Sequence, residues 1–529
     1  MFSQRMLGHL PMALHPGPVR RACIVGLGAG VTAGSIAVYA PEHLTAIELE
    51  KGVFTASRFF SVQNHGILQD PRVRIVLDDG RNWLERTDER FDVISSAPNF
   101  PSLTGSGALY SREFFTLCRR RLAPGGVMCQ FAPIWRLLPE DVATIVGSFA
   151  DTFPHVRLFS TGLSLVMLGR EEAFPPVDIP ELVRRTSLPR VAASLRDIGV
   201  RGPVELLSFY QMDEDEVRRL TTGADRNTDD RPRTEFRAPR GVFSDTVGPN
   251  LEAIGAKRPS AEVRADRLGL QGEWRSSFLA LASAYQAVTD GEILLARKRT
   301  QDALQILVPV AESGQRYARY LLADHALRMA LALQRENRLA DARGFFSMAV
   351  RYEPDNHDAL VGLGYVDLFL GEGEEAARVL HDAYQRYPES AGAAYRLGLV
   401  RQMDGHLQEA EGLYRRAIEL QPTLSAPHGL LGQILLQSGR AGEALARFDE
   451  AIDRGDVVEG PWVGRVAALL ALGRGEDAVT GAREAVERFP TSPGALDALA
   501  DAATAAGRAD EAREARRRRD ALAPAGGTR

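Results

Sequence analysis

RRACIVGLGAG, residues 20–30, places a short apolar run directly before three closely spaced glycines. The run predicts a buried strand, and Gly26, Gly28 and Gly30 predict a tight turn at which the backbone can approach a ligand closely. A helix that starts at about Val31 would direct its free N–H groups toward that ligand. A glycine-rich turn alone is weak evidence, because it is equally often only a turn.

Acidic residues follow the turn at the spacing of a nucleotide site. Glu48 lies at the end of a second predicted strand, where a carboxylate can accept hydrogen bonds from both ribose hydroxyls. Asp78, Asp79 and Gly80 follow a third predicted strand, where an acid can accept a hydrogen bond from an adenine amino group. The turn and the two acidic positions, in this order, predict a pocket for an adenosine-type ligand.

Short β-branched segments alternate with helical ones up to about Arg170, which predicts a Rossmann-like α/β domain with a doubly wound, mostly parallel sheet. We expect this domain over residues 1–170 and a helical and loop extension over 171–272. Within the extension, residues 227–232 are either an exposed turn or a loop that folds over the ligand site. The expected strands are 22–25, 44–47, 73–77, 92–95, 126–130 and 163–168.

A 34-residue period marks the second half of the chain. Alanines preceded by Asp or Glu recur at this spacing, as do glycine-type loop positions, and the pattern resembles tetratricopeptide (TPR) repeats, an all-α solenoid of paired helices. We expect repeats over 323–522, a divergent helical pair over 273–322 and a tail over 523–529. The repeated positions are Ala342, Ala376, Ala410, Ala444, Ala478 and Ala512, with Asn337, Gly371, Gly405, Gly439, Gly473 and Gly507 in the loops.

Composition narrows the possible functions. The net charge is −5 over 529 residues, which argues against a dedicated nucleic-acid binder. The three cysteines have no metal-site spacing and cannot form a disulfide framework, so we expect no metal and a cytoplasmic location. No apolar run reaches the roughly eighteen residues of a membrane span, so we expect no direct membrane insertion.

Residues 4–170 resemble spermidine synthases, the aminopropyltransferase branch of the S-adenosylmethionine-dependent methyltransferase fold, and most closely their bacterial relatives found in larger fusions. The resemblance implies that Glu48 holds the ribose and Asp79 the adenine of decarboxylated S-adenosylmethionine, S-adenosylmethionine or the thioether product, with Gln4 beside the nucleoside. The matching stretches are 4–11, 26–32, 47–50, 70–73, 78–82, 109–115, 122–126 and 227–232. The implied ligand-binding residues are Gln4, Gly26, Gly28, Gly30, Glu48, Asp78, Asp79 and Gly80.

Several positions depart from what aminopropyl transfer uses. The reaction needs a neutral amine, and the family supplies carboxylates that bind the diamine and accept its proton. Ala97 stands where such an acid is expected after the fourth strand, and Ala29 stands where one is expected in the turn. In the early helix, Ser3 and Arg5 replace a tyrosine and a glutamate. We therefore assign no catalytic residue and expect an altered acceptor site.

Further polar and aromatic residues are predicted near the cleft, but they form no recognisable pair of nucleophile and base. His9 is either a base or a structural histidine, and His65 is expected to be exposed in a loop. Tyr110 is expected to pack or cap, and Trp135 either stacks on a ligand or packs in the core. The full set is His9, Asn64, His65, Asn99, Tyr110, Arg112, Gln130, Trp135 and Arg136.

Two functions remain open at this point. One is a spermidine synthase-like transferase with an altered acceptor site. The alternative is a non-catalytic nucleotide-sensing or scaffold protein that acts through its repeats. Either way, the TPR groove predicts a protein partner. The sequence begins at the early helix, so we expect the N-terminal β-hairpin layer of such enzymes to be missing. The oligomeric state is not predicted.

Overall fold

The structure is a computed structural model that describes residues 1–103, 105–455 and 458–522. The tail predicted over 523–529 lies outside the described residues. The chain divides into two compact units, Met1–Leu321 and Leu322 onward, and the boundary lies within helix α16 (Arg316–Arg335).

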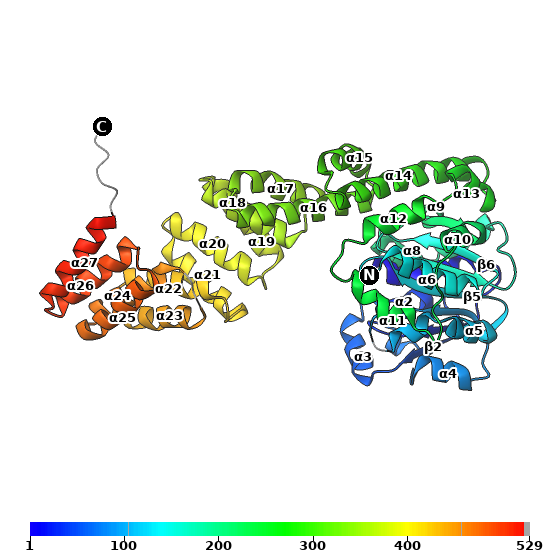
Figure 1. Ribbon diagram of the computed structural model, residues 1–529, viewed down its shortest axis with the longest axis horizontal. Coiled ribbons are helices and arrows are strands. Elements are labelled where there is room, and N and C mark those ends of the chain that lie inside the picture. The colour runs from blue at the N-terminus through cyan, green and yellow to red at the C-terminus, as the bar shows by residue number, and fades with distance from the viewer. Residues whose placement is uncertain (104, 456–457, 523–529) are drawn as a thin grey trace. The chain divides into compact units, whose positions relative to one another are not determined.

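An eight-stranded sheet forms the centre of the first unit, with the strand order β3-β2-β1-β4-β5-β7-β6-β8 (Figure 1). The first five strands in this order run parallel, whereas β7 is antiparallel to both of its neighbours and β8 is antiparallel to β6. The predicted doubly wound, mostly parallel sheet is therefore confirmed. Its strands are β1 (Arg21–Val25), β2 (His43–Glu48), β3 (Val73–Leu77), β4 (Phe91–Ser96), β5 (Leu122–Pro133), β6 (His155–Ser160), β7 (Ser164–Arg170) and β8 (Tyr210–Asp213).

Two strands, β6 and β8, were not predicted. Each strand carries a charged residue that interrupts its apolar pattern, Arg157 on β6 and Asp213 on β8. The two residues are register partners, and their charged groups lie 3.4 Å apart. Arg157 is only 3% exposed. The last strand of the sheet therefore comes from the segment 171–272, where only helices and loops were expected.

Helices cover both faces of the sheet. On one face, the Leu7 carbonyl of α1 (Phe2–Leu14) accepts hydrogen bonds from Ser95 of β4 and Cys129 of β5, and α2 (Val31–Ala37) packs on the β1 side. On the other face, α5 (Arg112–Arg121) and α6 (Pro139–Ala150) bury Phe115 and Phe149 in edge-to-face contact. Short helices complete this part: α3 (Lys51–Ala56), α4 (Gly80–Arg86) and the 3-10 helices η1 (Ser57–Phe60), η2 (Ile67–Gln69) and η3 (Ser106–Tyr110).

The rest of the first unit is mostly helical. Some of its helices cover the β6–β8 side of the sheet through a second apolar cluster that includes Leu195, Leu206 and Phe278, whereas others add residues such as Val217 and Leu251 to the cluster of Phe115 and Phe149. These helices are α7 (Ile179–Thr186), α8 (Pro189–Asp197), α9 (Pro203–Ser208), α10 (Glu214–Leu220), α11 (Arg233–Arg237), η4 (Ala238–Gly241), α12 (Val247–Gly255), α13 (Ala261–Arg267), α14 (Gly272–Ala296) and α15 (Thr300–Glu312).

The second unit consists of helix pairs at the predicted 34-residue spacing, which confirms the TPR solenoid. The six repeated alanines are all buried, and the six predicted loop positions all have positive φ, including Asn337 at φ 58°. A Cβ on Gly364 would lie 2.4 Å from Leu380, which explains a glycine there. The helices after α16 are α17 (Leu339–Tyr352), α18 (His357–Phe369), α19 (Gly373–Arg386), α20 (Ala391–Met403), α21 (Leu407–Leu420), α22 (Ser425–Gln437), α23 (Ala441–Asp453), α24 (Glu459–Ala471), α25 (Gly475–Arg488), α26 (Pro493–Ala505) and α27 (Ala509–Leu522).

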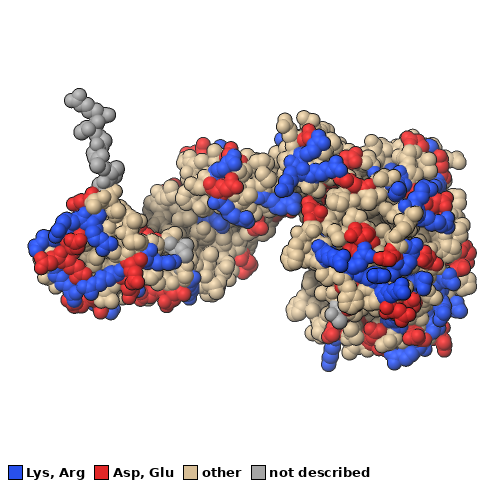
Figure 2. Space-filling model, viewed as in Figure 1, with Lys and Arg blue, Asp and Glu red and all other residues tan. Residues whose placement is uncertain are grey.

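The surface carries both signs of charge. On the face shown in Figure 2, Lys and Arg side chains are interspersed with Asp and Glu side chains on each unit. Many form ion pairs, such as Arg440 with Glu411 and Glu443 at 2.9 and 2.7 Å. Over the described ranges, no helix combines the length and the apolar character needed to cross a membrane.

Candidate functional site

The glycine turn after β1 lies at the carboxyl edge of the sheet. Gly26, Gly28 and Gly30 have φ values of 90°, 53° and 79°, a region that side chains disfavour, so the turn needs glycine. The Gly26 N–H donates to the carbonyl of Ile47 on β2 at 3.0 Å, and the Ala97 N–H after β4 donates to the carbonyl of Val25 at 3.2 Å. The turn is thus fixed between the ends of three parallel strands.

Glu48 ends β2 beside this turn. One carboxylate oxygen accepts hydrogen bonds from the backbone N–H groups of Leu27 and Gly28, at 3.0 and 3.2 Å. The other oxygen accepts from the N–H of Glu50 at 3.0 Å. The residue is 9% exposed. The oxygen that accepts from Glu50 keeps one free lone pair, so Glu48 can hold the turn and still accept one hydroxyl hydrogen bond.

Asp78, Asp79 and Gly80 connect β3 to α4. The Asp79 side chain caps α4 by accepting from the N–H of Asn82 at 2.8 Å, whereas Asp78 is paired with Arg86. Gly80 lies so close to β1 that a Cβ there would be 2.5 Å from a methyl group of Val25. The close packing of Gly80 holds this acidic loop against the strand that leads into the glycine turn.

Gln4 lies near the same edge, on the exposed side of α1. Its backbone carbonyl accepts a hydrogen bond from Thr32 at 2.9 Å, which ties α1 to the start of α2. Asn64, which is buried, donates to the carbonyl of Ala29 inside the turn at 3.1 Å. The structure therefore brings together the turn, Glu48, Gly80 and the backbone of Gln4, while the Asp78 carboxylate is engaged by Arg86.

Arg5 and two histidines form a buried polar cluster with α8. Ser194 accepts from Arg5 and bonds to His9 at 2.9 Å and to His65 at 3.1 Å, and Arg5 is also paired with Asp197 at 3.3 Å. Burial, with the charge of Arg5 as a second cause, lowers the pKa of His9 to about 3.

The contacts of this cluster test what the sequence predicted for its two histidines. His9 is fully buried and also bonded to Tyr39, so it is structural. The prediction that His65 is exposed is wrong, because it is half-buried and its pKa is lowered by burial. Sequence reasoning missed Ser194, since it lies more than a hundred residues from its partners in the chain.

Uncharged side chains end β4 and β5. Ser96 and Gln130 are register partners at the carboxyl edge, both fully buried, and the Ser96 hydroxyl and the Gln130 Oε1 have no hydrogen-bond partner in the described structure. Ala97 follows directly, with its carbonyl 3.3 Å from where a Cβ on Gly26 would lie. Two neutral polar atoms are therefore left beside the turn, next to Ala97, the position at which the resemblance implies an acid.

Aromatic residues border the same edge. The rings of Phe100 and Trp135 lie 5.2 Å apart, and the guanidinium of Arg136 lies over Trp135 at 5.1 Å. Tyr110 is fully buried and donates to the carbonyl of Asn99 at 3.1 Å, so it packs as predicted. These contacts make the loop after β4 apolar and fix its backbone.

Residues 227–232 pack over η3 and the start of α5. Asn227 is fully buried: its side chain donates to the carbonyl of Gly107 at 2.9 Å and accepts from the N–H of Thr234 at 3.1 Å. Asp229 is paired with Arg81 of α4 at 2.7 Å. The segment is thus anchored through Asn227 to the loop that follows β4, while residues 229–231 are exposed in a turn closed by hydrogen bonds between Thr228 and Arg231, as the first alternative expects.

Metal ligands do not cluster here: within the described ranges, no group of three or more His, Cys, Asp or Glu side chains is arranged to hold a metal ion.

The fold and the site define the class of protein: an α/β domain of the methyltransferase type with a nucleotide-type turn, joined to TPR repeats. Residues 1–163 match the family described as "Spermine/spermidine synthase domain", and residues 365–425 match a tetratricopeptide repeat family. Polyamine aminopropyltransferase 1 of Pseudomonas aeruginosa is 31% identical over 200 residues, which are 37% of this chain and 68% of that protein. The chain belongs to the spermine/spermidine synthase family.

Other relatives agree on the family. Spermidine synthase of Dictyostelium discoideum is 29% identical over 30% of this chain and 56% of its own length, and the polyamine aminopropyltransferase of Nitrosomonas europaea is 34% identical over 30% and 48%. The chain thus spans about half the length of most of these relatives.

Two kinds of solved structure each match about a third of the chain. Spermidine synthase from Thermotoga maritima covers 35% of this chain and 65% of its own, with 24% identity and a TM-score of 0.30. The TPR protein YrrB covers 33% and 91%, with 22% identity and a TM-score of 0.28.

Proposed function

We propose that this protein is a transferase that binds decarboxylated S-adenosylmethionine, or S-adenosylmethionine itself, at the carboxyl edge of its sheet. The acceptor differs from the dicationic diamine of spermidine synthesis, and the TPR repeats bind a protein partner. The site residues are those of the sequence analysis, from Gln4 to Gly80. We place the protein in the cytoplasm, which fits its three buried, unpaired cysteines.

The position of Glu48 carries the donor half of the proposal. Its carboxylate lies at the end of β2 in contact with Gly28, where its remaining lone pair can accept a hydroxyl of a ribose that rests on the glycine turn. Asp79 is at the end of the next strand, where the carboxylate oxygen not used in capping α4 can accept from an amino group. A nucleoside between Glu48 and Asp79 would be bound at its ribose by the first and at its base by the second.

The ends of β4 and β5 carry the acceptor half. Ser96, Ala97 and Gln130 offer no charge to a dication, and Phe100 packed on Trp135 makes the adjoining loop apolar. The charge of Arg5 faces Asp197 and α8. A diamine would find no carboxylate here to balance its two positive charges. An acceptor with a single amine, or with an anionic group, does not need such carboxylates.

Donor binding is tested by isothermal titration with decarboxylated S-adenosylmethionine, S-adenosylmethionine and methylthioadenosine. We expect one sulfonium compound to bind, and Glu48→Ala to weaken its binding about tenfold or more, because a charge-assisted hydrogen bond to the ribose is lost. Glu50→Ala, an exposed acid two residues on, is the matched control and should bind like the wild type. Absence of heat with all three compounds would contradict the proposal.

Acceptor choice is tested by the release of methylthioadenosine from decarboxylated S-adenosylmethionine. Wild-type protein should turn over putrescine poorly, and Ala97→Asp should raise the putrescine-dependent rate about tenfold or more, since a carboxylate there can bind the diamine and take its proton. Leu103→Asp adds the same charge farther along the exposed part of this loop and should not. Rapid wild-type turnover of putrescine would refute the altered acceptor.

The partner site that we propose lies on the first helices of the early repeats. Phe369 and Met403 occupy the same position in successive repeats and are 57% and 69% exposed. The rings of Tyr365 and Phe369 lie 4.6 Å apart in a tilted contact, and Arg396 lies over the rings of Tyr365 and Tyr395 at 5.3 and 5.0 Å. Apolar side chains around a cation suit a peptide that carries an apolar and an acidic residue.

The domain limits drawn from the sequence stay part of the proposal: a nucleotide-binding domain over 1–170, an extension over 171–272, a helical pair over 273–322 and repeats over 323–522.

A further inference from the structure

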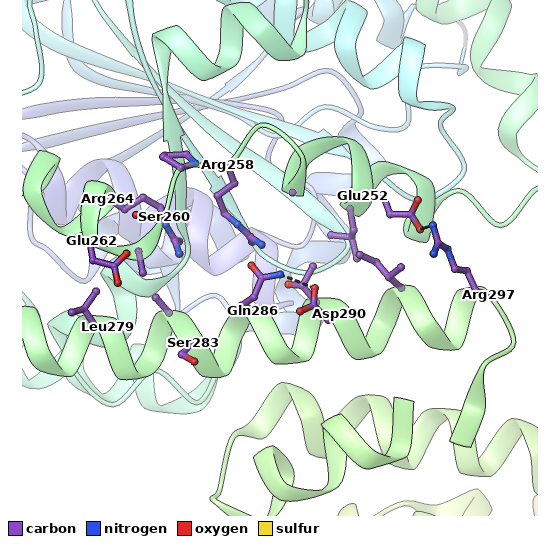
Figure 3. Close-up of a pocket in the computed structure, with 17 residues that line it drawn as sticks. Glu252, Arg258, Ser260, Glu262, Arg264, Leu279, Ser283, Gln286, Asp290 and Arg297 are labelled. Atoms are coloured by element: carbon purple, nitrogen blue, oxygen red, sulfur yellow. Dashed lines mark hydrogen bonds and ion pairs between the residues drawn. The ribbon is translucent and has the colours of Figure 1, made fainter. Parts of the chain in front are cut away.

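A cavity of about 610 Å³ lies away from the glycine turn, between α12, α13 and α14 of the first unit (Figure 3). Its apolar lining comes from Leu251, Leu279 and Ile293, and its polar lining includes Arg258, Arg264, Ser283 and Gln286. The volume is that of a small-molecule site. Nothing in the transferase proposal uses this cavity.

Two arginines on its wall are held from one side only. Arg258 donates to the side chain of Gln211 at 2.9 Å, and Arg264 donates to the backbone carbonyl of Tyr210 at 2.7 Å. Both acceptors are on β8 and both are uncharged. Neither guanidinium forms an ion pair with a carboxylate within the described structure.

Arg264 is strongly desolvated. It is 3% exposed, its Nε has no hydrogen-bond partner in the described part of the chain, and its guanidinium lies 5.7 Å from the centre of the Phe278 ring. Burial and the neighbouring charge of Arg258 lower its pKa to about 10. A buried cation is costly without a carboxylate in ion-pair contact, so the buried Arg264 together with the half-buried Arg258 beside it favours an anion that brings two charges.

The carboxylates of the cavity are already engaged or lie at its margin. Glu252 is paired with Arg297 at 2.7 Å, and Asp290 accepts from Gln286 at 2.6 Å. In Figure 3 the Arg258 guanidinium points toward Gln286 and Asp290 of α14, and the Glu252–Arg297 pair lies at the opposite end from Arg264. Glu262 is exposed at the other margin.

We propose that this cavity binds a small organic dianion, a phosphate monoester or a dicarboxylate, through Arg258 and Arg264. The planar guanidinium groups donate in pairs to phosphate or carboxylate oxygens. Gln286 and Ser283 donate to the same group or to hydroxyls of the ligand, and the apolar wall contacts its carbon skeleton. The site is separate from the nucleoside pocket and carries no reacting group.

The test is isothermal titration of the full chain with inorganic phosphate and, separately, with succinate, which distinguishes the two sources of charge. We expect one probe to bind in a 1:1 complex, and Arg258→Gln to weaken it about tenfold or more, because a charge-assisted hydrogen bond is lost. Gln286→Glu replaces a half-exposed side chain of α14 with one of the same shape but with a negative charge that repels an anion. It should weaken the binding of the probe by a similar factor, and it serves as the test if Arg258→Gln folds poorly.

Arg275→Gln is the matched control. Arg275 is on α14, pairs with Asp266 and does not line the cavity, so the affinity should stay within about twofold. No heat from either probe at about 10 mM, where even a millimolar Kd would be seen, would overturn the proposal. Equal affinity of the wild type and both cavity variants would overturn it as well.

Discussion

The Glu48 carboxylate accepts a 3.2 Å hydrogen bond from the backbone N–H of Gly28, the middle glycine of the turn. A side chain expected only to meet a ligand therefore also shapes the backbone on which that ligand would rest. Three backbone N–H groups, those of Leu27, Gly28 and Glu50, share this one carboxylate. The turn and the carboxylate depend on each other before any ligand binds.

Removal of this carboxylate should destabilise the first unit. We expect Glu48→Ala to lower its free energy of unfolding by about 1–3 kcal/mol, because buried N–H groups lose their acceptor. Glu48→Gln keeps one oxygen and should lose less. Urea denaturation measures both, with Glu50→Ala as the control. If Glu48→Ala matches Glu50→Ala, the hydrogen bonds do not support the turn.

Gly80 and Gly52 offer a matched pair of glycines near helix starts. Gly80→Ala should cost about 1–3 kcal/mol, because its Cβ would overlap Val25 at 2.5 Å. Gly52→Ala, on α3 with no atom within 4 Å of the new Cβ, should be neutral or stabilise by up to about 1 kcal/mol. Thermal unfolding of the two variants measures the contrast. Similar melting temperatures would show that Val25 moves aside freely.

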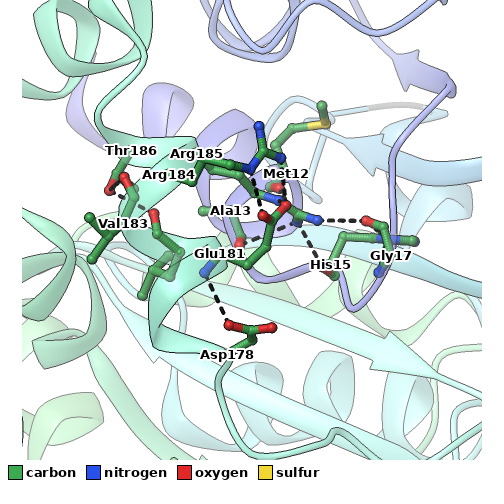
Figure 4. Close-up of polar contacts among 11 residues, drawn as sticks. Met12, Ala13, His15, Gly17, Asp178, Glu181, Val183, Arg184, Arg185 and Thr186 are labelled. Carbon is green, nitrogen blue, oxygen red and sulfur yellow. Dashed lines mark hydrogen bonds and ion pairs between the residues drawn. The ribbon is translucent and has the colours of Figure 1, made fainter.

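Arg185 of α7 binds the end of α1, the helix that carries Gln4 (Figure 4). It donates to the carbonyls of Met12, His15 and Gly17 at 3.0, 2.7 and 2.7 Å and is 7% exposed. Arg185→Met should cost about 3 kcal/mol, because buried carbonyls lose charged donors.

Hydrogen exchange reports the same change locally. In Arg185→Met, the amides of residues 10–17 should exchange faster than in the wild type, since the end of α1 is released. Arg184→Met is the control: Arg184 is paired with the same Glu181 but is exposed, so exchange should not change. Equal exchange in both variants would argue against a role for Arg185 in holding α1.

Glu292 of α14 makes the stability of the first unit depend on pH. Burial raises its pKa from 4.5 to about 7, and it accepts a hydrogen bond from Tyr317 at 3.0 Å. The folded state thus favours the protonated acid. Its contribution to stability is full below pH 4.5, falls as the pH rises, and is lost above about 7.

The variant Glu292→Gln isolates this effect, because it stays neutral at every pH while other titrating groups are shared with the wild type. The wild type should lose about 3 kcal/mol relative to the variant between pH 4.5 and 7.5. Chemical denaturation across this range measures the difference. A constant difference between the two proteins would mean that Glu292 does not titrate on unfolding in this window.

The features that could be predicted from the sequence are those that depend on local patterns. The glycine turn, the acids at the ends of β2 and β3, and the repeat all rest on spacing within one or two elements, and these spacings are fixed by strand and helix geometry. Asn337 fits the series of loop glycines because asparagine also tolerates positive φ. The family resemblance followed from the same local motifs.

Tertiary structure decided the rest. Strands β6 and β8 carry Arg157 and Asp213, whose charges are compatible with burial only because each strand supplies the partner of the other. Ser194 fixes Arg5, His9 and His65 from more than a hundred residues away, and Asn227 joins η3 to α11. The sequence by itself determined the turn, the acidic positions and the repeats, since each is a local spacing. Only the folded chain determined which buried polar groups meet, because their partners are set by long-range packing that no local pattern encodes.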